Sequence, residues 1–209
     1  MSSMTLFYQT LNRSGGYPVN ADGTYYVYGR YKTFIASDCR QRCVYCDCHE
    51  SELGGPEMMQ LDHFRPESRC EFAHLRNDPH NLHYSCGRCN LLKSDNWPAK
   101  DLKLCCDGDT GFIDPFVEGR DAYFSIAADG SIEPLTPPAM YVIKLLQLDR
   151  QHLRKLRYRR QLKDELKAVI ESKRDLILKD AEEGKIIDLA ALKEIFSTYD
   201  RIISLVEDF

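Results

Sequence analysis

The sequence predicts a mixed α+β protein, and three observations support this fold class. The first half of the chain is rich in cysteine and shows little helical periodicity. A short alternating stretch near residue 130 has the pattern of a hairpin, and from Ala139 the apolar residues recur with a helical period of about 3.6. The 209 residues are enough for one domain with an extra lobe, or for two small domains.

These patterns divide the chain into four segments. Residues 1–38 form a loop-rich N-terminal extension with several tyrosines, and a short helix is expected from Tyr31 to Ser37. Residues 39–100 form a cysteine-rich core. Residues 101–138 form an irregular segment with one hairpin, whose strands AYFSIA and SIEPL meet at Asp129-Gly130, a favourable pair for a tight turn. Residues 139–209 form a helical lobe, with a break at Gly184 before a last amphipathic helix over 189–206.

Composition narrows the class of protein and its compartment. No run of about eighteen apolar residues occurs, so no membrane span is expected. The N-terminal stretch lacks a basic start followed by an apolar run, which argues against a secretory signal and for a cytoplasmic location. The formal net charge of −4 argues against a protein that coats nucleic acid by bulk charge.

Two cysteine pairs have the spacing of metal ligands. Cys43 and Cys46 enclose Val-Tyr, and Cys86 and Cys89 enclose Gly-Arg. Two such turns offer four thiolates in a tetrahedron, the geometry of a structural zinc site. Unrelated buried cysteines and a redox pair are the alternatives, and the second is weakened because neither pair lies in a thioredoxin-like βαβ pattern.

Nine cysteines, an odd number, also argue against a secreted disulfide framework. The cysteines outside the two pairs are expected to be small buried or reduced residues: Cys39, Cys48, Cys70, Cys105 and Cys106. Of these, Cys39 and Cys48 are the candidates for a substitute ligand. A site closed by four thiolates would fold the protein and perform no chemistry.

Polar residues that could carry chemistry lie between and just after the two cysteine pairs. Asp62 and His63 stand side by side in the stretch LDHFRPES, Asn81 follows, and a helix is expected to begin at Asn90. A zinc ion bound by both pairs would draw these segments together. The sequence therefore predicts a carboxylate, an imidazole and two carboxamides close in space.

With these residues in view, positions 43–96 resemble an HNH endonuclease, the ββα-metal nuclease fold on a frame of zinc knuckles. The family pattern is CxxC, an acidic residue with His and a nearby Pro, then Asn-Leu, then CxxC-Asn-x-x-Lys. This sequence has CVYC, LDHFRP, NL at 81–82 and CGRCNLLK. The last position of the family motif is often His and is Asn90 here.

The resemblance implies a role for each matched residue. His63 would be the general base that activates water, and Asp62 and Asn90 would hold one Mg²⁺ or Mn²⁺ ion. Asn81 would orient His63. The chemistry agrees, because oxygen ligands suit a hard cation and a neutral imidazole suits proton abstraction near neutral pH. The products would carry 5′-phosphate and 3′-hydroxyl ends.

Basic residues are the candidates for contact with nucleic acid. Lys93, placed one turn into the expected helix, and Arg65 lie close to the motif, and either could instead be structural. A second basic set recurs every three or four residues along the C-terminal helix and could follow a phosphate backbone: Arg150, Arg154, Arg157, Arg160, Lys163 and Lys167. A solvated face, or a surface for an acidic partner protein, is the alternative.

A weaker resemblance concerns the C-terminal part, from FIDPFVEG through the hairpin to IKLLQLDRQHLRKLRYRR. Its order is similar to that of the HNH nucleases of Septu-type bacterial anti-phage defence. That resemblance implies an ATPase partner and invading DNA as the target. The expected function is therefore a metal-dependent DNA endonuclease, in which double-strand cleavage would require a homodimer or two separate events.

Two other functions use the same residues. A zinc-dependent adaptor for nucleic acid or protein would need the cysteines alone and no cleavage. An RNA-directed nuclease would share the whole site, and no residue in the sequence marks recognition of a 2′-hydroxyl.

Overall fold

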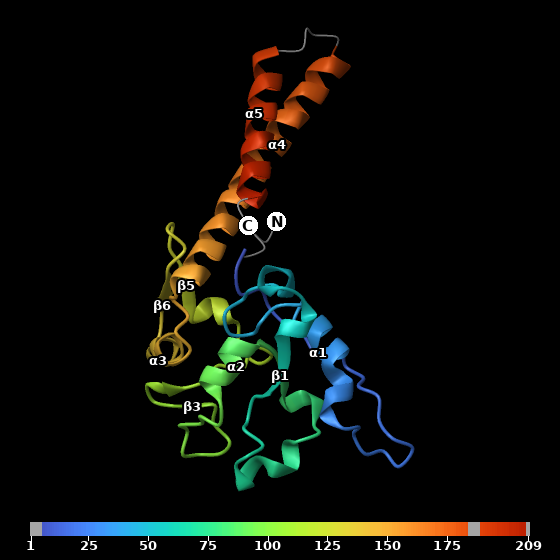
Figure 1. Ribbon diagram of the computed structural model, residues 1–209, viewed down its shortest axis with the longest axis vertical. Helices are drawn as coiled ribbons and strands as arrows, with labels where there is room; N and C mark the ends of the chain where they lie inside the picture. Colours follow the sequence, from blue (N-terminus) through green and yellow to red (C-terminus); the bar gives the residue numbers. More distant parts are fainter. Residues whose placement is uncertain (1–5, 184–188, 208–209) are drawn as a thin grey trace.

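The computed structural model describes residues 6–183 and 189–207, and it has a mixed α+β architecture (Figure 1). The α-helices are α1 (Lys32–Asp38), α2 (Gly87–Lys93), α3 (Pro137–Leu145), α4 (Gln151–Glu182) and α5 (Leu189–Glu207). Three small antiparallel sheets pair β1 (Met59–His63) with β2 (Leu82–Cys86), β3 (Cys106–Asp107) with β4 (Thr110–Gly111), and β5 (Phe124–Ile126) with β6 (Ile132–Pro134). Short 3₁₀ turns occur at Tyr28–Tyr31, Glu50–Leu53, Pro56–Met58, Cys70–Leu75, Pro79–Asn81 and Arg120–Ala122.

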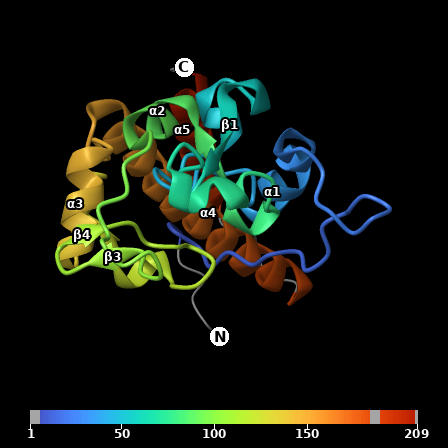
Figure 2. The same ribbon diagram turned by 90° about the horizontal axis from the view of Figure 1, so that it is seen from below.

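The β1–β2 hairpin lies between two helices. In its register Asp62 faces His83, and His63 faces Leu82. Residues that face each other across antiparallel strands point to the same side of the sheet, and neighbours along a strand point to opposite sides. Asp62 and His63 therefore lie on different faces. Figures 1 and 2 show α2 and α1 on opposite sides of β1, with α2 on the side that Asp62 faces.

The N-terminal segment has many turns, and it packs against the core through buried tyrosine side chains. The predicted helix from Tyr31 to Ser37 is present as α1, preceded by a 3₁₀ turn. The Tyr31 ring is fully buried, and its hydroxyl donates to the Pro18 carbonyl (2.8 Å) and accepts from the Tyr26 amide (2.9 Å).

The predicted hairpin at Asp129-Gly130 is confirmed as β5–β6. Gly130 has a φ of +79°, a left-handed conformation that favours glycine. The Asp129 carboxylate accepts hydrogen bonds from the Ser131 amide (2.9 Å) and hydroxyl (2.6 Å), which stabilises the turn. The turn rests against α4, where the Arg157 Nε donates to the Gly130 carbonyl (2.7 Å).

The C-terminal lobe is helical, as predicted. α3 begins with Pro137 and Pro138, positions where a missing amide proton costs nothing. α4 and α5 lie side by side as an antiparallel pair that extends away from the rest of the molecule (Figure 1). The predicted break at Gly184 lies outside the described residues.

One helix boundary differs from the prediction. α2 begins at Gly87, three residues before Asn90, because the Cys86 thiol caps the helix by accepting from the Cys89 amide (3.5 Å). Lys93, predicted one turn into the helix, is therefore its last residue.

A single buried apolar cluster joins all four sequence segments, through residues such as Tyr8, Phe64, Phe112 and Leu153. Trp97 lies near its centre, with ring centroids 5.2 Å from Phe64 and 6.1 Å from Phe112. Among the described residues, no helix is both long enough and apolar enough to cross a membrane.

We expect Gly130→Ala to lower the free energy of unfolding by about 2–4 kcal/mol. The left-handed backbone conformation is unfavourable for alanine, and the added methyl group would also overpack the site. A Cβ atom at this position would overlap the carbonyl oxygen of Arg154 and lie 2.7 Å from the Tyr158 amide nitrogen. Urea unfolding measures the change. Gly108→Ala is the matched control, because Gly108 also has a positive φ (+61°) but faces open space. Equal effects at both positions would contradict close packing of α4 on the turn.

Candidate metal centre and adjoining polar site

Four buried thiols converge where the first cysteine turn meets the β1–β2 hairpin. The sulfur atoms of Cys43, Cys46, Cys86 and Cys89 all lie within 4.8 Å of one another. Within the part of the chain that the structure describes, this is the one group of cysteine, histidine and acidic side chains arranged to hold a metal ion. The donor set and its burial fit a structural zinc ion, as the spacing predicts.

Local backbone contacts hold the two cysteine turns together. The Val44 amide donates to the Tyr84 carbonyl of β2 (3.0 Å), and the Cys43 amide donates to the Cys48 carbonyl (2.9 Å). The second turn is the N-terminus of α2, where Cys86 is the cap. The first turn is therefore joined to β2 by its backbone, and the second turn is part of α2.

The thiols need a cation if they are to ionise together. Contact with neighbouring thiols, Cys43 first, and burial raise the pKa of Cys89 well above its usual value. Without a metal the cluster retains protons, because several negative charges at this separation in a buried site repel strongly. A bound Zn²⁺ would remove that penalty and make the site pH-dependent.

The two candidate substitute ligands lie outside the four-thiol cluster. Cys48 is buried, and its sulfur lies 3.9 Å from the Cys46 carbonyl oxygen. Cys39 is fully buried, and burial raises its pKa to about 12, which favours a neutral thiol. Both fit the predicted role of small buried residues.

Asp62 is buried and paired with two partners. Its carboxylate accepts from the Tyr45 hydroxyl (2.5 Å) and from the Lys93 ammonium (3.0 Å). The same ammonium also donates to the backbone carbonyl of His63 (2.8 Å). Lys93 is fully buried, so it neutralises Asp62 where a phosphate cannot reach it in this conformation.

His63 lies at the end of β1, on the face opposite Asp62. Its Nε2 atom is 2.8 Å from the Arg76 carbonyl oxygen, and its ring is 4.8 Å from that of Tyr28. A carbonyl oxygen can only accept, so Nε2 must carry the proton in this hydrogen bond. The lone pair of the neutral ring is then on Nδ1. Glu67 lies 3.8 Å from Nε2 and is the nearest carboxylate recorded for this ring.

Asn81 holds the backbone just beyond His63. Its side-chain oxygen accepts from the Arg65 amide (2.9 Å), its side-chain amide donates to the Arg65 carbonyl (3.0 Å), and its own carbonyl accepts from the Phe64 amide (2.9 Å). The three bonds fix the path of the chain as it leaves β1. Asn81 thus acts on the backbone beside His63.

Asn90 lies on α2, on the same side of β1 as Asp62. Its side-chain amide donates to the Gln60 side chain (2.7 Å), and Gln60 is two residues before Asp62 on the same face of the strand. The structure therefore brings the carboxylate and one carboxamide to the side of β1 that α2 covers. His63 and Asn81 lie at the strand end, where the chain turns.

The arginines at the start of α4 have protein partners. Arg157 is 1% exposed and donates to the carbonyls of Gly130 and Leu148, so it cannot reach nucleic acid in this conformation. Arg154 pairs with Asp149, and Arg150 donates to the Leu146 carbonyl (2.8 Å).

Arg160 also pairs with protein groups. It donates to the buried carboxylate of Asp47 (2.7 Å) and to Glu52 (3.1 Å). This part of α4 thus anchors the helix to the first cysteine turn. Arg157 and Arg160 are thus held by protein groups, whereas Lys163 and Lys167 are exposed, and the phosphate track along α4 stays a prediction.

Arg65 lies between an aromatic ring and a backbone carbonyl group. Its guanidinium lies 5.7 Å from the centre of the Trp97 ring and is 3.4 Å from the Lys103 carbonyl oxygen. It is partly exposed and stays available near the end of β1.

The sequence did not reveal how Tyr45 contributes to the site, and it offered His83 only as a reserve site residue. Tyr45, inside the first cysteine turn, bonds to Asp62, and no spacing rule marks such a contact. His83 is fully buried across the hairpin from Asp62 and lies 3.7 Å from Asp114. Burial lowers the pKa of His83, so its ring is held neutral.

The chain was compared with known proteins: no protein-family model matches it, and no curated protein matches it significantly.

We expect the purified protein to contain one zinc ion per chain and to lose cooperative folding when a strong chelator removes it. Structural zinc contributes about 10–16 kcal/mol in small zinc domains, as much as the whole stability of a typical domain. Elemental analysis and circular dichroism measure both quantities. Cys46→Ser should lose zinc, whereas Cys70→Ser, at an exposed cysteine outside the cluster, should keep it. Retention of zinc by both variants would contradict the four-thiolate site.

Proposed function

We propose that this chain is a zinc-framed, divalent-metal-dependent endonuclease of the HNH type that hydrolyses phosphodiester bonds in DNA. One observation carries the proposal: the four-thiol cluster lies beside a hairpin that presents Asp62 and His63, and a helix that carries Asn90 packs on the Asp62 side. A zinc-dependent adaptor would need the four-thiol cluster and would have no need of Asp62, His63 or Asn90. The polar residues beyond it match the motif that the sequence resembles.

His63 is the proposed general base. Its Nε2 proton is engaged by the Arg76 carbonyl, which leaves the Nδ1 lone pair to accept a proton from water. Asn81 supports this role indirectly, because it holds the backbone of Arg65 and Phe64 directly after His63. A fixed ring orientation is what a base needs to act on one water molecule.

Asp62 and Asn90 are the proposed ligands of the catalytic ion, which is Mg²⁺ or Mn²⁺. A carboxylate and a carboxamide on adjoining elements fit a hard cation that keeps several of its waters. When bound, such an ion supplies charge neutralisation at the phosphate and at the leaving oxygen. In this conformation Lys93 opposes binding of the ion, because its ammonium already contacts Asp62 at 3.0 Å and would repel a second cation. Binding therefore requires Lys93 to move.

Exposed cations near His63 support an anionic substrate. The Arg76 side chain is 65% exposed beside the His63 ring, and its Nε atom is 3.2 Å from Glu67. Arg65, also partly exposed, follows the strand end. A phosphate at the end of β1 could contact both guanidinium groups, and Arg76 in particular would exchange Glu67 for it.

A role in cytoplasmic anti-phage defence with an ATPase partner is part of the proposal. Its support is the sequence resemblance of the C-terminal part, together with the order of a hairpin followed by a long helix in the structure.

The second candidate function is a zinc-dependent adaptor without cleavage. The observation that favours it is the closed arrangement around Asp62, whose carboxylate is buried and already neutralised by Lys93. In an adaptor this pair would simply be part of the core.

We expect the wild-type protein to nick supercoiled plasmid in Mg²⁺ or Mn²⁺ at low salt, and His63→Ala to lose at least about a hundredfold of this activity, the usual contribution of a general base. EDTA should abolish nicking, and fresh Mg²⁺ should restore it. His152→Ala is the matched control, since His152 is an exposed residue of α4.

Zinc content should be equal in the three proteins of this assay. Equal nicking by wild type and His63→Ala would exclude His63 as the base. No cleavage of DNA or of RNA by zinc-loaded wild type, with or without an ATPase partner, would favour the adaptor.

We expect Lys93→Met to increase the stabilisation that Mn²⁺ gives the protein, because the variant removes the cation that competes for Asp62. Without added metal, the variant should be less stable by about 3–5 kcal/mol, since it leaves a buried carboxylate unpaired. Thermal unfolding with and without Mn²⁺ measures both effects. Lys100→Met, at an exposed lysine, should change neither. An equal response to Mn²⁺ in wild type and Lys93→Met would contradict a metal site at Asp62.

A further inference from the structure

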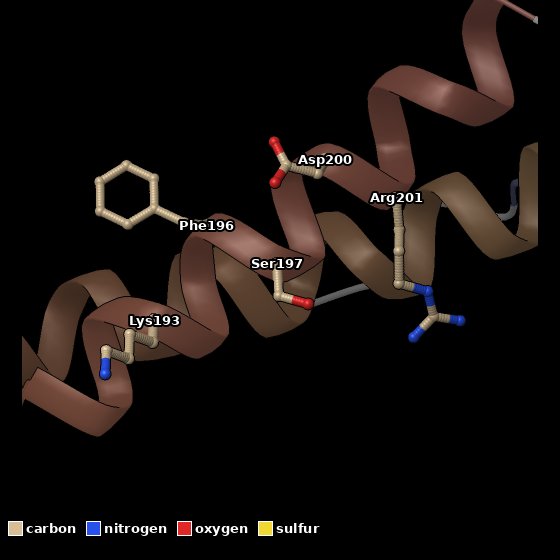
Figure 3. A pocket seen from close by; sticks show the side chains of 5 residues that line it. All are labelled: Lys193, Phe196, Ser197, Asp200 and Arg201. Carbon is tan, nitrogen blue, oxygen red and sulfur yellow. The ribbon is translucent and has the colours of Figure 1, made fainter.

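The outer face of α5 carries an open pocket of about 570 Å³ (Figure 3). Five side chains of this one helix line it: Lys193, Phe196, Ser197, Asp200 and Arg201. Figure 3 shows the Phe196 ring extending away from the helix, with α4 behind.

The pocket lies on the side of α5 that α4 does not cover. Among the positions of α5 whose burial the structure describes, Ala191, Leu192 and Ile195 are half-buried and Thr198 is buried, and these residues lie toward the seam with α4. Leu189 and Phe196 are 65% and 63% exposed. At 3.6 residues per turn, positions 189, 193, 196 and 200 recur on one face, because they are spaced four, three and four apart. We call Leu189, Lys193, Phe196 and Asp200 the outer stripe.

The outer stripe combines apolar side chains with one charge of each sign. Lys193 and Asp200 have no ion-pair partner among the residues that the structure describes. Elsewhere on the same helix pair, charges are paired across the seam, as Lys173 is with Glu194. The stripe thus presents an exposed aromatic ring between two opposite charges.

We propose that the outer stripe binds the outer stripe of a second copy of this chain, with the two α5 helices antiparallel. The midpoint between positions 196 and 197 is equally far from Lys193 and Asp200. A two-fold axis there places each Lys193 level with the partner's Asp200, about 5 Å from the axis at a rise of 1.5 Å per residue. The two Phe196 rings meet at the centre, and two ion pairs flank them.

The charge pattern is the reason for choosing a second copy as the occupant. A two-fold interface must be complementary to itself, and a stripe with opposite charges at equal distances from its centre meets that condition. Nucleic acid would place phosphates against Asp200. One helix pair is smaller than the roughly 1,600 Å² of a standard stable interface, so the dimer should dissociate on dilution. This inference does not rest on the proposed nuclease activity.

Charge exchange on the full-length, zinc-loaded protein tests the arrangement. Wild type should sediment as a dimer at high concentration and as a monomer on dilution. Lys193→Asp and Asp200→Lys should each weaken the dimer by about tenfold or more, because like charges then face each other twice. The double variant should restore dimerisation, since the pairs re-form with their signs exchanged. Phe196→Ser should abolish the dimer.

Lys163→Asp, a matched charge change on the exposed face of α4, should leave dimerisation unaltered. Helical content and zinc content should be the same in all variants, so that loss of the dimer is separated from loss of folding. A wild-type protein that stays monomeric at every concentration would overturn the proposal. A dimer that survives both single exchanges, or a double variant that fails to restore it, would overturn the antiparallel register.

Discussion

The convergence of four buried thiols is the constraint on which the rest of the structure depends. It joins a turn that follows α1 to the end of β2 and the start of α2, segments that are far apart in the sequence. The hairpin that carries Asp62 and His63 lies between these elements, and the helix that carries Asn90 begins at one of the thiols. Small sheets of two strands are marginal alone, so a metal bound here would supply what the short elements lack.

A second link ties the C-terminal lobe to this frame. Asp47, directly after Cys46, is buried and accepts a hydrogen bond from Arg160 of α4, with Arg120 4.0 Å away. A buried carboxylate between two guanidinium groups is stable only while both remain in place. The long helix is therefore connected to the first cysteine turn by charge as well as by apolar packing. Arg157 and Arg160 of α4 therefore face inward, whereas Lys163 and Lys167 are exposed.

Local patterns predicted local features well. The two cysteine spacings predicted the thiol cluster, Asp129-Gly130 predicted the hairpin turn, and helical periodicity predicted the lobe. Long-range partners were not predictable, because a charged residue in a sequence carries no mark of burial: Lys93 and Arg157 have partners 31 and 27 residues away. The start of α2 was missed because cysteine is not a usual helix cap. The catalytic roles of Asp62, His63, Asn81 and Asn90 stay predictions.

The length of α4 has a geometric consequence for paired copies. From Gln151 to Lys173, where α4 meets α5, the helix spans about 33 Å. Antiparallel pairing through α5 would place the two thiol clusters and their hairpins at opposite ends, separated by about two such lengths. That distance corresponds to about 20 base pairs of duplex. For the proposed nuclease, such an assembly would set the distance between its two cuts, which would leave long single-stranded ends instead of a blunt break.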